Sequence, residues 1–339
     1  MRKIGIPNGK SQKVRIGVIA ASSFVAQQAV IPAIEESSKA ELVALASRSK
    51  ASQLAGKYKI EVSDDYLSLI RSDAVDAIYI PLPNAMHAEA IRLAIANNKH
   101  VLCEKPLAMS EEEAAELALS ADKSSLILME AYMTHYHPRS QELLNIVSAR
   151  NSISLKHIHA SFSGTLTKPD DYRWKPELGG GSLRDVGIYL IAPILGATQQ
   201  LPLSVVGQAS WTSAGVDDSF AGLLRFRDGI TASIFSSFKA GEGQSLEFIL
   251  EKGRIIIDRA FTPSLEDNSF QVTDKDGKMK KFKFRPANCY LEMIDHFCDL
   301  VHEHASPLRP ISESILVQKI IDHLLISARH GRIEYLEPQ

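Results

Sequence analysis

The chain has 339 residues, 45% of them hydrophobic, which is enough for a large core divided between two domains. It carries 38 lysines and arginines against 40 aspartates and glutamates, so no charge excess indicates a nucleic acid or an acidic membrane as partner. Three scattered cysteines form neither a metal-site spacing nor a disulfide framework, which favours a reducing, cytoplasmic compartment, and no apolar run is long enough to span a bilayer.

The N-terminal stretch MRKIGIPNGKSQK lacks the apolar centre of a signal peptide, as expected for a cytoplasmic protein. Residues 1–12 are polar and include glycine and proline, so the sequence predicts a flexible tail there. We expect the folded part of the chain to begin at residue 13.

Residues 13–135 alternate between short apolar runs and amphipathic segments, a pattern typical of βαβ units in a parallel sheet covered on both faces. The predicted strands are Val14–Ala20, Leu42–Ala46, Ala77–Ile80, Val101–Cys103 and Leu126–Met129. The predicted helices between them are Val25–Glu36, Lys50–Tyr58, Tyr66–Arg71, Ala85–Asn97 and Glu111–Ser124. We therefore expect a first domain over residues 13–135.

From about residue 150 the pattern becomes mostly strands. The predicted strands are Ile153–Ser163, Leu203–Ser213, Gly222–Phe226, Thr231–Phe238, Leu246–Leu250 and Arg254–Asp258. The pairs Asp228-Gly229 and Asp276-Gly277 mark turns of antiparallel hairpins. Two helices, Tyr290–Glu303 and Ser312–Ala328, are predicted to close a second domain over residues 136–339.

The first strand-to-helix turn of such a parallel sheet is expected to bind phosphates. Here it reads GVIAASSFV from Gly17 to Val25, with Ala20 and Ser22 where the first two glycines of G-x-G-x-x-G would stand. These small residues permit close backbone approach, and the amides of the following helix could bind a pyrophosphate. The alternative is an ordinary tight turn with no ligand. If the turn binds a dinucleotide, the predicted cofactor-binding residues are Ala20, Ser22, Ser23, Phe24 and Val25.

The end of the second predicted strand indicates which dinucleotide would bind. An acidic residue there commonly contacts the ribose 2′-hydroxyl of NAD, whereas an arginine suits the 2′-phosphate of NADP. This chain has Ser47-Arg48-Ser49 and no acid. Guanidinium and hydroxyl donors match a phosphate, so Ser47 and Arg48 favour NADP, with NAD as the second possibility. Arg48 could instead be a solvated surface charge.

Two further strand ends reach the same edge of the sheet. After Ile80 the prolines of Pro81-Leu82-Pro83 fix the chain, and Asn84 is expected to cap a helix whose first turn contains His87. Pro81, Leu82, Asn84 and His87 are therefore predicted to line the cofactor, although a structural hydrogen bond is the commoner role of a lone histidine.

The segment Glu104-Lys105-Pro106 ends the strand at Val101–Cys103. A lysine cation at this edge could hydrogen-bond the oxygen of a carbinol or ketone, and a desolvated lysine could move a proton. A surface ion pair between Glu104 and Lys105 is the alternative, but neighbours along a chain rarely face each other. Both residues are predicted to contact the cofactor, and Lys105 the substrate as well.

A glycine motif, Gly179-Gly180-Gly181, lets the chain turn tightly and approach a ligand. A helix is predicted to start near Ser182, a good N-cap residue, so that Asp185 and Tyr189 share one face. A carboxylate and a phenol on one face can hold a polyol and move its proton. The alternative is a capped helix with an exposed aspartate and a half-buried tyrosine.

Four motifs in this order and spacing resemble the Gfo/Idh/MocA oxidoreductases, which include glucose–fructose oxidoreductase and inositol dehydrogenase. They are Pro81-Leu82-Pro83-Asn84-x-x-His87, Glu104-Lys105-Pro106, Glu130-Ala131-Tyr132-Met133-x-x-Tyr136-His137-Pro138 and Gly179-Gly180-Gly181-Ser182-Leu183-x-Asp185-x-Gly187-x-Tyr189. The resemblance covers nearly the whole chain after the tail. It implies an α/β protein with an N-terminal Rossmann dinucleotide-binding domain and a C-terminal α/β domain built on a large, mostly antiparallel open sheet.

The resemblance also implies roles for individual residues. Lys105 and Tyr189 are expected to transfer protons, and Asp185 to orient substrate hydroxyls. Tyr136 is a further expected substrate residue, and Arg173 lies in a segment similar to one that the family places near the nicotinamide. His135 and His137 lack further spaced ligands, so no metal is expected.

The resemblance implies an NAD(P)-dependent oxidoreductase, with NADP preferred, that passes a hydride between nicotinamide and a carbinol, a ketone or the anomeric carbon of a sugar. Tyr189 is similar to glucose–fructose oxidoreductase and to the sugar 3-ketoreductases of deoxysugar pathways. The alternatives are an enzyme like trans-dihydrodiol dehydrogenase, which needs a more apolar pocket, and a regulator that senses cofactor or sugar without turnover. The expected partners are a small carbohydrate and further copies of the chain, in a homodimer or homotetramer, with no nucleic acid and no membrane.

Overall fold

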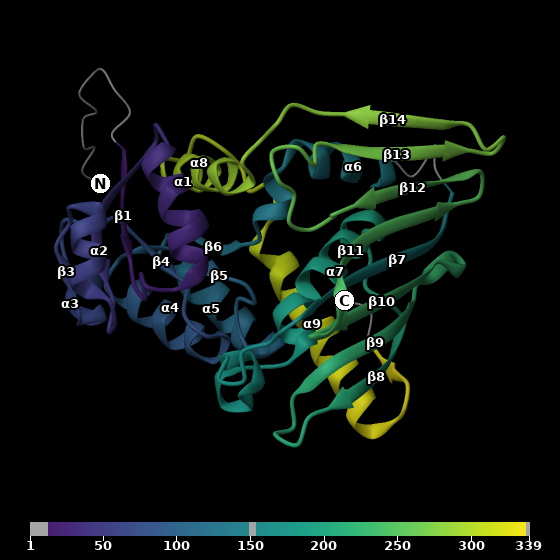
Figure 1. Cartoon of the computed structure of the whole chain (residues 1–339), viewed down its shortest axis with the longest axis horizontal. Coiled ribbons are helices and arrows are strands. Elements are labelled where there is room, and N and C mark those ends of the chain that lie inside the picture. Colours follow the sequence, from purple (N-terminus) through teal and green to yellow (C-terminus); the bar gives the residue numbers. More distant parts are fainter. Residues whose placement is uncertain (1–12, 149–153, 337–339) are drawn as a thin grey trace.

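The computed structural model describes residues 13–148 and 154–336, so the tail predicted over residues 1–12 lies outside the described residues. The first part contains a six-stranded parallel sheet in the order β3-β2-β1-β4-β5-β6 (Figure 1). Its strands are β1 (Val14–Val18), β2 (Ala40–Ala46), β3 (Val62–Ser63), β4 (Ala77–Ile80), β5 (His100–Glu104) and β6 (Leu128–Ala131). The predicted Rossmann fold is confirmed.

Helices cover both faces of this sheet because its strands are apolar on both sides. The connecting helices are η1 (Ala26–Val30), α1 (Ile31–Glu36), α2 (Ala51–Tyr58), α3 (Tyr66–Arg71), η2 (Asn84–Met86), α4 (His87–Ala96) and α5 (Glu111–Lys123). The strand order reverses on the two sides of β1, whose neighbours are β2 and β4. Such a switch point leaves a crevice at the carboxyl ends of the strands, where nucleotides bind in this class of sheet.

The second sheet has nine strands in the order β14-β13-β12-β11-β7-β10-β9-β8-β15, and only β7 and β10 among its neighbouring strands run parallel. Its strands are β7 (Leu155–Thr165), β8 (Ser204–Trp211), β9 (Asp217–Arg225), β10 (Thr231–Ser237), β11 (Lys239–Leu250), β12 (Gly253–Asp258), β13 (Ser269–Asp274), β14 (Met279–Lys283) and β15 (Glu334–Tyr335). The prediction of a large, mostly antiparallel open sheet is confirmed.

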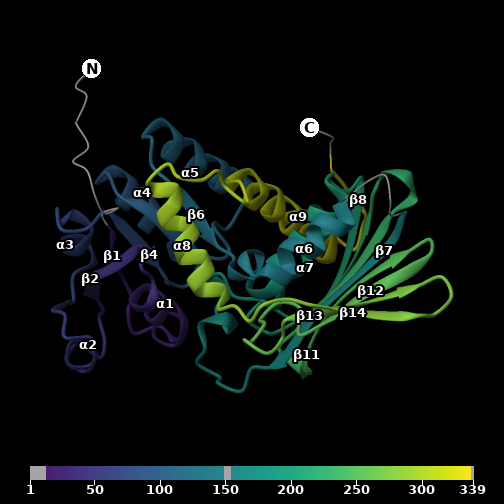
Figure 2. The same ribbon diagram turned by 90° about the horizontal axis from the view of Figure 1, so that it is seen from above.

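The remaining helices all follow β6 along the chain. They are η3 (Met133–Tyr136), α6 (Pro138–Ser148), η4 (Tyr172–Trp174), η5 (Pro176–Leu178), α7 (Ser182–Thr198), η6 (Arg227–Gly229), α8 (Cys289–Val301) and α9 (Ile311–His330). Helices α6, α7 and α9 lie on one face of the second sheet (Figure 2). Helix α8 returns to the first sheet and packs against α1. Nearby, Lys39 Nζ, just before β2, lies 2.7 Å from Asp299 Oδ2 of α8. The predicted domain division at residue 135 remains a prediction.

Most predicted elements are present, and the differences follow from packing. Strand β9 begins five residues before the predicted Gly222, and β11 seven residues before Leu246. The added half of β11 is polar and mostly exposed, whereas the added residues of β9 include the buried Asp217 and Asp218. Strands β3, β13, β14 and β15 and helix α6 escaped prediction, since they are short or partly exposed and lack a clear apolar period. In the described part of the chain, none of the helices combines the length and the apolar character that crossing a bilayer needs.

Candidate active site

A cleft of about 640 Å³ lies at the carboxyl ends of the first sheet and extends to helix α7. The residues that line it are Ala20, Ser22, Ser23, Phe24, Val25, Gln28, Ala29, Arg48, Tyr66, Pro81, Leu82, Pro83, Asn84, Met86, Glu104, Lys105, Met133, Asp171, Tyr172, Arg173, Tyr189 and Tyr290. A second cavity, of about 200 Å³ beside α6 and α7, contains none of the predicted site residues. We therefore consider the larger cleft as the site.

The phosphate-loop prediction is supported by the position of the whole turn from Ala20 to Val25 on the cleft wall. Ala20 has a φ of 47°, the left-handed conformation that a glycine adopts freely and an alanine at a cost of about 1–2 kcal/mol. Ser23 Oγ accepts the Ala26 amide at 3.3 Å, so the amides of Phe24 and Val25 are those that an anion could meet at the start of this helix. This donor set fits a dinucleotide pyrophosphate, although the role of these residues stays a prediction.

Arg48 lies at the same end of the cleft, with its guanidinium carbon 5.1 Å from the centroid of the Tyr66 ring. Within residues 13–148 and 154–336, no carboxylate forms an ion pair with it, so its charge is available to a 2′-phosphate. Ser47 differs from the expectation. It is 1% exposed, and its hydroxyl donates to the Ser49 carbonyl at 2.6 Å. The hydroxyl near the cleft is instead that of Ser49, which lies 3.0 Å from the Ser22 hydroxyl.

The loop after β4 lines the cleft with Pro81, Leu82 and Asn84, as predicted. Asn84 does not cap the helix, however. Its side-chain amide donates to the Gly179 carbonyl at 2.9 Å and so ties this loop to the glycine motif.

His87 has no exposed surface, which corrects the expectation that it lines the cofactor. Its Nδ1 lies 2.7 Å from the Pro106 carbonyl oxygen and its Nε2 2.8 Å from that of Leu82. Burial lowers the pKa of His87, so at neutral pH the ring carries one N–H and donates to one of these two carbonyl oxygens. The histidine thus lies beneath the cleft, between the loops of Leu82 and Pro106.

Lys105 enters the cleft from the end of β5 and meets helix α7. Its Nζ lies 3.0 Å from Asp185 Oδ1 and 2.7 Å from the Asp185 carbonyl oxygen. Arg173 Nε donates to the other carboxylate oxygen, Asp185 Oδ2, at 2.7 Å. Burial opposes ionisation of Asp185, but Lys105 and Arg173 outweigh it and lower its pKa to about 2. Both carboxylate oxygens are thus bound to cations, and Asp185 is not among the residues that line the cleft, so its expected role in orienting substrate hydroxyls remains a prediction.

As the sequence predicted, Glu104 and Lys105 do not form an ion pair with each other. The Tyr79 hydroxyl donates to Glu104 Oε1 at 2.8 Å, and burial raises the pKa of this carboxyl. Glu104 lies on the cleft wall, where a contact with the cofactor remains a prediction.

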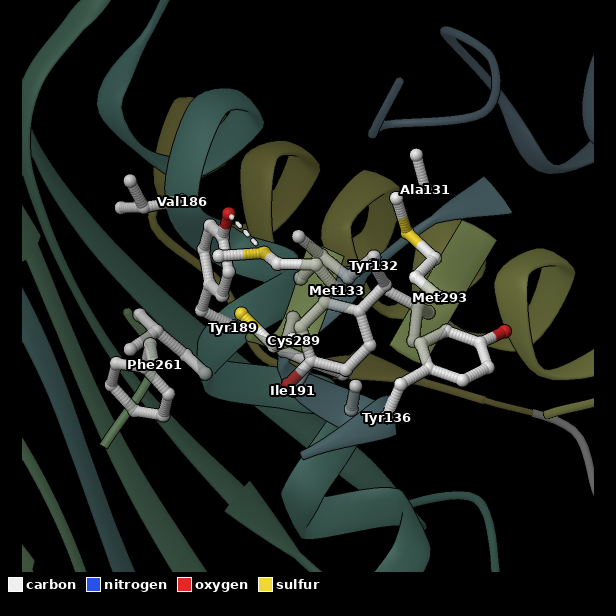
Figure 3. Close-up of a cluster of buried hydrophobic side chains, with 14 of the residues drawn as sticks. Ala131, Tyr132, Met133, Tyr136, Val186, Tyr189, Ile191, Phe261, Cys289 and Met293 are labelled. Carbon is white, nitrogen blue, oxygen red and sulfur yellow. Dashed lines mark hydrogen bonds between the residues drawn. The ribbon is translucent and has the colours of Figure 1, made fainter. Parts of the chain in front are cut away.

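Tyr189 lies one helical turn after Asp185, and its ring centroid is 5.3 Å from Lys105 Nζ. Its hydroxyl contacts the Met133 sulfur at 3.6 Å, a weak bond that leaves the group available to a ligand (Figure 3). Burial raises the pKa of Tyr189 well above its usual value, so the phenol holds its proton at neutral pH. An ammonium and a protonated phenol are thus next to each other in the cleft.

Tyr136 does not reach the cleft, which corrects the expectation of a substrate contact. It is 5% exposed, and its hydroxyl contacts the Met129 sulfur at 3.3 Å. Figure 3 shows it on the far side of an apolar cluster from Tyr189. It is therefore part of the core between the sheets.

The two histidines near Tyr136 also form structural contacts. His135 Nε2 lies 3.2 Å from the Leu308 carbonyl oxygen, and the buried His137 Nδ1 accepts the Arg139 amide at 3.1 Å. Across the described ranges no three histidine, cysteine, aspartate or glutamate side chains gather in a metal-binding arrangement.

The glycine motif positions the start of α7. A Cβ at Gly180 would collide with the Arg173 carbonyl, so the glycine allows the Arg173 segment to lie over the cleft. The predicted cap was Ser182, but this serine is already helical. The cap comes from β9, where Asp217 Oδ2 accepts the Leu183 amide at 2.8 Å and the Ser182 hydroxyl at 2.6 Å.

Several aromatic cleft residues escaped sequence analysis. They are Tyr66, Tyr172 and Tyr290, which come from α3, η4 and α8. No local signal points to Tyr66 or Tyr290, since each stands at the start of an ordinary amphipathic helix. Tyr172 directly precedes Arg173, so the segment that indicated Arg173 could also have indicated Tyr172.

Comparisons with known proteins show which family the chain belongs to. A family model described as "Oxidoreductase family, NAD-binding Rossmann fold" matches residues 14–132, and one described as "GFO/IDH/MocA C-terminal domain" matches residues 153–256. The chain is 31% identical over 320 residues to a D-xylose 1-dehydrogenase (NADP(+)) of Haloferax volcanii, covering 92% of this chain and 97% of that protein. It is 37% identical over 260 residues to a dTDP-3,4-didehydro-2,6-dideoxy-alpha-D-glucose 3-reductase of Saccharopolyspora spinosa, covering 75% and 77%.

One solved structure with a similar fold is KijD10, a 3-ketoreductase from Actinomadura kijaniata in complex with NADP and TDP-benzene. The TM-score is 0.87 at 26% sequence identity, and the match covers 93% of this chain and 98% of that chain. The similarity therefore extends over both sheets and the cleft between them.

Proposed function

The chain belongs to the Gfo/Idh/MocA family of oxidoreductases, and on that premise we propose that it transfers a hydride between NADP and an uncharged sugar. It is an NAD(P)-dependent oxidoreductase. The observation that carries the proposal is the pairing of Lys105 with Tyr189 at 5.3 Å in the cleft at the switch point of the first sheet. The alternative of a non-catalytic sensor has no comparable observation in its favour.

In this proposal, one end of the cleft binds the phosphates of the cofactor and the other end carries the groups that transfer protons. The turn from Ala20 to Val25 would hold the pyrophosphate, and Arg48 the 2′-phosphate. The bound nicotinamide supplies or accepts the hydride. In reduction Tyr189 donates its proton to the substrate oxygen while Lys105 hydrogen-bonds that oxygen; in oxidation the two residues act in reverse.

The charges near Lys105 favour a neutral substrate. The two cations of this end, Lys105 and Arg173, are both bound to carboxylates, because Arg173 also contacts Asp171 Oδ1 at 3.1 Å. The buried side chain of Glu104 is a carboxyl group, so it offers no positive charge to a phosphate. A phosphate group here would meet no free cation among the described residues that line the cleft. Hydroxyl groups, in contrast, could accept and donate hydrogen bonds without disturbing these pairs.

A substrate screen tests this selectivity. We expect kcat/KM for neutral aldoses, ketoses or inositols to exceed that for sugar phosphates and dTDP-ketosugars by about a hundredfold, or about 3 kcal/mol, since like-charge contacts are costly. Asp171→Asn keeps the oxygen that caps η4 but removes the charge, and should raise the relative kcat/KM for a sugar phosphate about tenfold. Higher kcat/KM for the charged substrates would refute neutrality. No turnover of any sugar, despite NADP binding, would support the sensor.

NADP(H) should bind more tightly than NAD(H) because Arg48 is available to the 2′-phosphate. One charge-assisted contact contributes about 1.5–3 kcal/mol, equivalent to about ten- to a hundredfold in Kd. Calorimetric titration of both cofactors measures the ratio. Arg48→Ala should abolish the preference, whereas Lys57→Ala, on the exposed surface of α2, should preserve it. Equal affinities in the wild type would contradict the assignment.

We also propose that the second sheet forms a homodimer or homotetramer through the face opposite to α7 and α9. Leu223 and Ile249 are 56% and 38% exposed on that face, and the described residues place no helix over it (Figure 2). His157 and His159 lie among them on β7, with His157 bonded to Thr231 Oγ1 at 2.8 Å. Burying a flat, partly apolar sheet face against a second copy removes this surface from water.

Light scattering should therefore give a mass at least twice the 37.3 kDa of the chain at micromolar concentration. Leu223→Glu should shift the mass toward the monomer, because it places a carboxylate in the proposed interface. Leu265→Glu is the matched control, since Leu265 is 57% exposed on a loop outside the sheet. A monomeric wild type would exclude the interface.

A further inference from the structure

A fully buried ion pair lies behind the cleft and links the two parts of the chain. Arg309 Nη1 lies 2.8 Å from Glu130 Oε2, and each side chain is 3% exposed. Glu130 belongs to β6 of the first sheet, whereas Arg309 precedes α9, which packs against α7 and the second sheet. Burial of two charges is expensive, so a pair in this position calls for a role beyond simple packing.

The second oxygen of Glu130 reaches the loop that carries Lys105. Glu130 Oε1 accepts the backbone N–H of Leu107 at 2.8 Å. The carbonyl oxygen of Pro106 lies 2.7 Å from His87 Nδ1. The peptide group between Pro106 and Leu107, directly after Lys105, thus has its N–H bonded to Glu130 and its carbonyl oxygen next to His87, and neither side chain lines the cleft.

Arg309 is held so that it cannot easily leave Glu130. Its Nη1 also donates to Ser314 Oγ at 2.8 Å in the first turn of α9, and its guanidinium lies 5.4 Å from the Tyr132 ring centroid. Its Nε and Nη2 have no hydrogen-bond partner among the described residues. Glu130 thus provides the hydrogen-bonded ionic contact to this buried cation, and the carboxylate of Glu313 lies 3.5 Å from its Nε.

We propose that Glu130 and Arg309 are positioning residues that fix the Lys105 loop against helix α9. Through this contact the geometry of Lys105 relative to Tyr189, which is on α7, depends on how the two parts of the chain are packed. Arg309 holds the Glu130 carboxylate, and the carboxylate holds the Leu107 amide directly after Lys105 and Pro106. The proposal rests on the proposed function insofar as it predicts turnover.

The test compares two double variants that differ only in the acceptor for Leu107. Arg309→Met alone would leave a buried, unpaired carboxylate and could unfold the protein, so both variants remove both charges. Glu130→Gln with Arg309→Met keeps an amide oxygen for the Leu107 N–H, whereas Glu130→Leu with Arg309→Met offers none. Arg92→Met, which breaks an exposed ion pair between α4 and α5, is the surface control.

Two measurements on these proteins separate positioning from folding. The double variant with Glu130→Gln should retain kcat within about threefold of wild type. The double variant with Glu130→Leu should have a kcat about ten- to a hundredfold lower, because rates are sensitive to misplacement of a catalytic group. Titration with NADPH measures the concentration of folded binding sites. The Kd for NADPH should change less than threefold in both double variants. Equal kcat per site for the two double variants would overturn the proposal.

Hydrogen exchange of the Leu107 amide gives a readout that needs no substrate. It should be faster in the Glu130→Leu pair than in the Glu130→Gln pair or in Arg92→Met. Unchanged exchange would refute the positioning role even if the protein turned over no sugar. Faster exchange without any turnover in the wild type would instead refute the proposed function and leave the structural link intact.

Discussion

Replacing Lys105 with methionine should lower kcat by about 10²–10⁴-fold, the range that a positioned acid–base group contributes, equivalent to about 3–5 kcal/mol. Methionine keeps most of the side-chain length and removes the charge. Asp185 remains bound to Arg173 at 2.7 Å in this variant, so no buried carboxylate is left unpaired. The loss should therefore appear in turnover more than in thermal stability.

Steady-state kinetics and thermal unfolding on the same preparation measure both effects. Lys319→Met is a matched control, because Lys319 is 15% exposed against 13% for Lys105 and is also paired with a carboxylate, that of Glu111 at 3.1 Å. It lies on α9, away from the cleft, and should leave kcat unchanged. A Lys105→Met protein with near wild-type kcat would show that this lysine has no role in the chemistry.

Tyr189→Phe should also lower kcat by about 10²–10⁴-fold, while the affinity for NADP(H) changes little. The substitution removes only a hydroxyl that, among the described residues, has the Met133 sulfur as its one hydrogen-bond partner. The ring keeps its neighbours Tyr132, Phe162 and Phe261, with centroids 5.6, 5.4 and 6.0 Å away. The melting temperature should therefore stay close to that of the wild type.

The pH dependence gives this prediction a second readout. Burial raises the pKa of Tyr189, so the phenol is protonated throughout the neutral range and loses its proton only as the pH rises through the raised value. Deprotonation of Tyr189 should thus cause no fall in reductive kcat below about pH 10, the usual tyrosine value. Tyr132→Phe, in the same apolar cluster, is the control and should retain both rate and profile. Normal turnover of Tyr189→Phe would assign the proton to another group.

The sequence was sufficient for the fold and for the end of the cleft where Lys105 lies. Alternation of apolar runs with amphipathic segments is a local property, and the parallel sheet follows from it because βαβ units pack in only a few ways. The predicted turn from Ala20 to Val25, Arg48, the Pro81 loop and Lys105 all reach one cleft, since strand ends of a parallel sheet share an edge. Helical periodicity likewise placed Asp185 and Tyr189 on one face of α7.

What only the tertiary structure decided is which partner each polar side chain takes. Ser47, His87 and Tyr136 carry the right chemistry for a site, but all three are 5% exposed or less, because the nearest acceptor or apolar neighbour lies inside the fold. Asn84 contacts the glycine motif, 95 residues along the chain, in place of the expected helix cap, and the cap of α7 comes from Asp217, 34 residues from Leu183. Such contacts depend on how the two sheets pack, and no local pattern encodes them. The link from Arg309 through Glu130 to the Lys105 loop belongs to the same class, since Arg309 is 179 residues from Glu130.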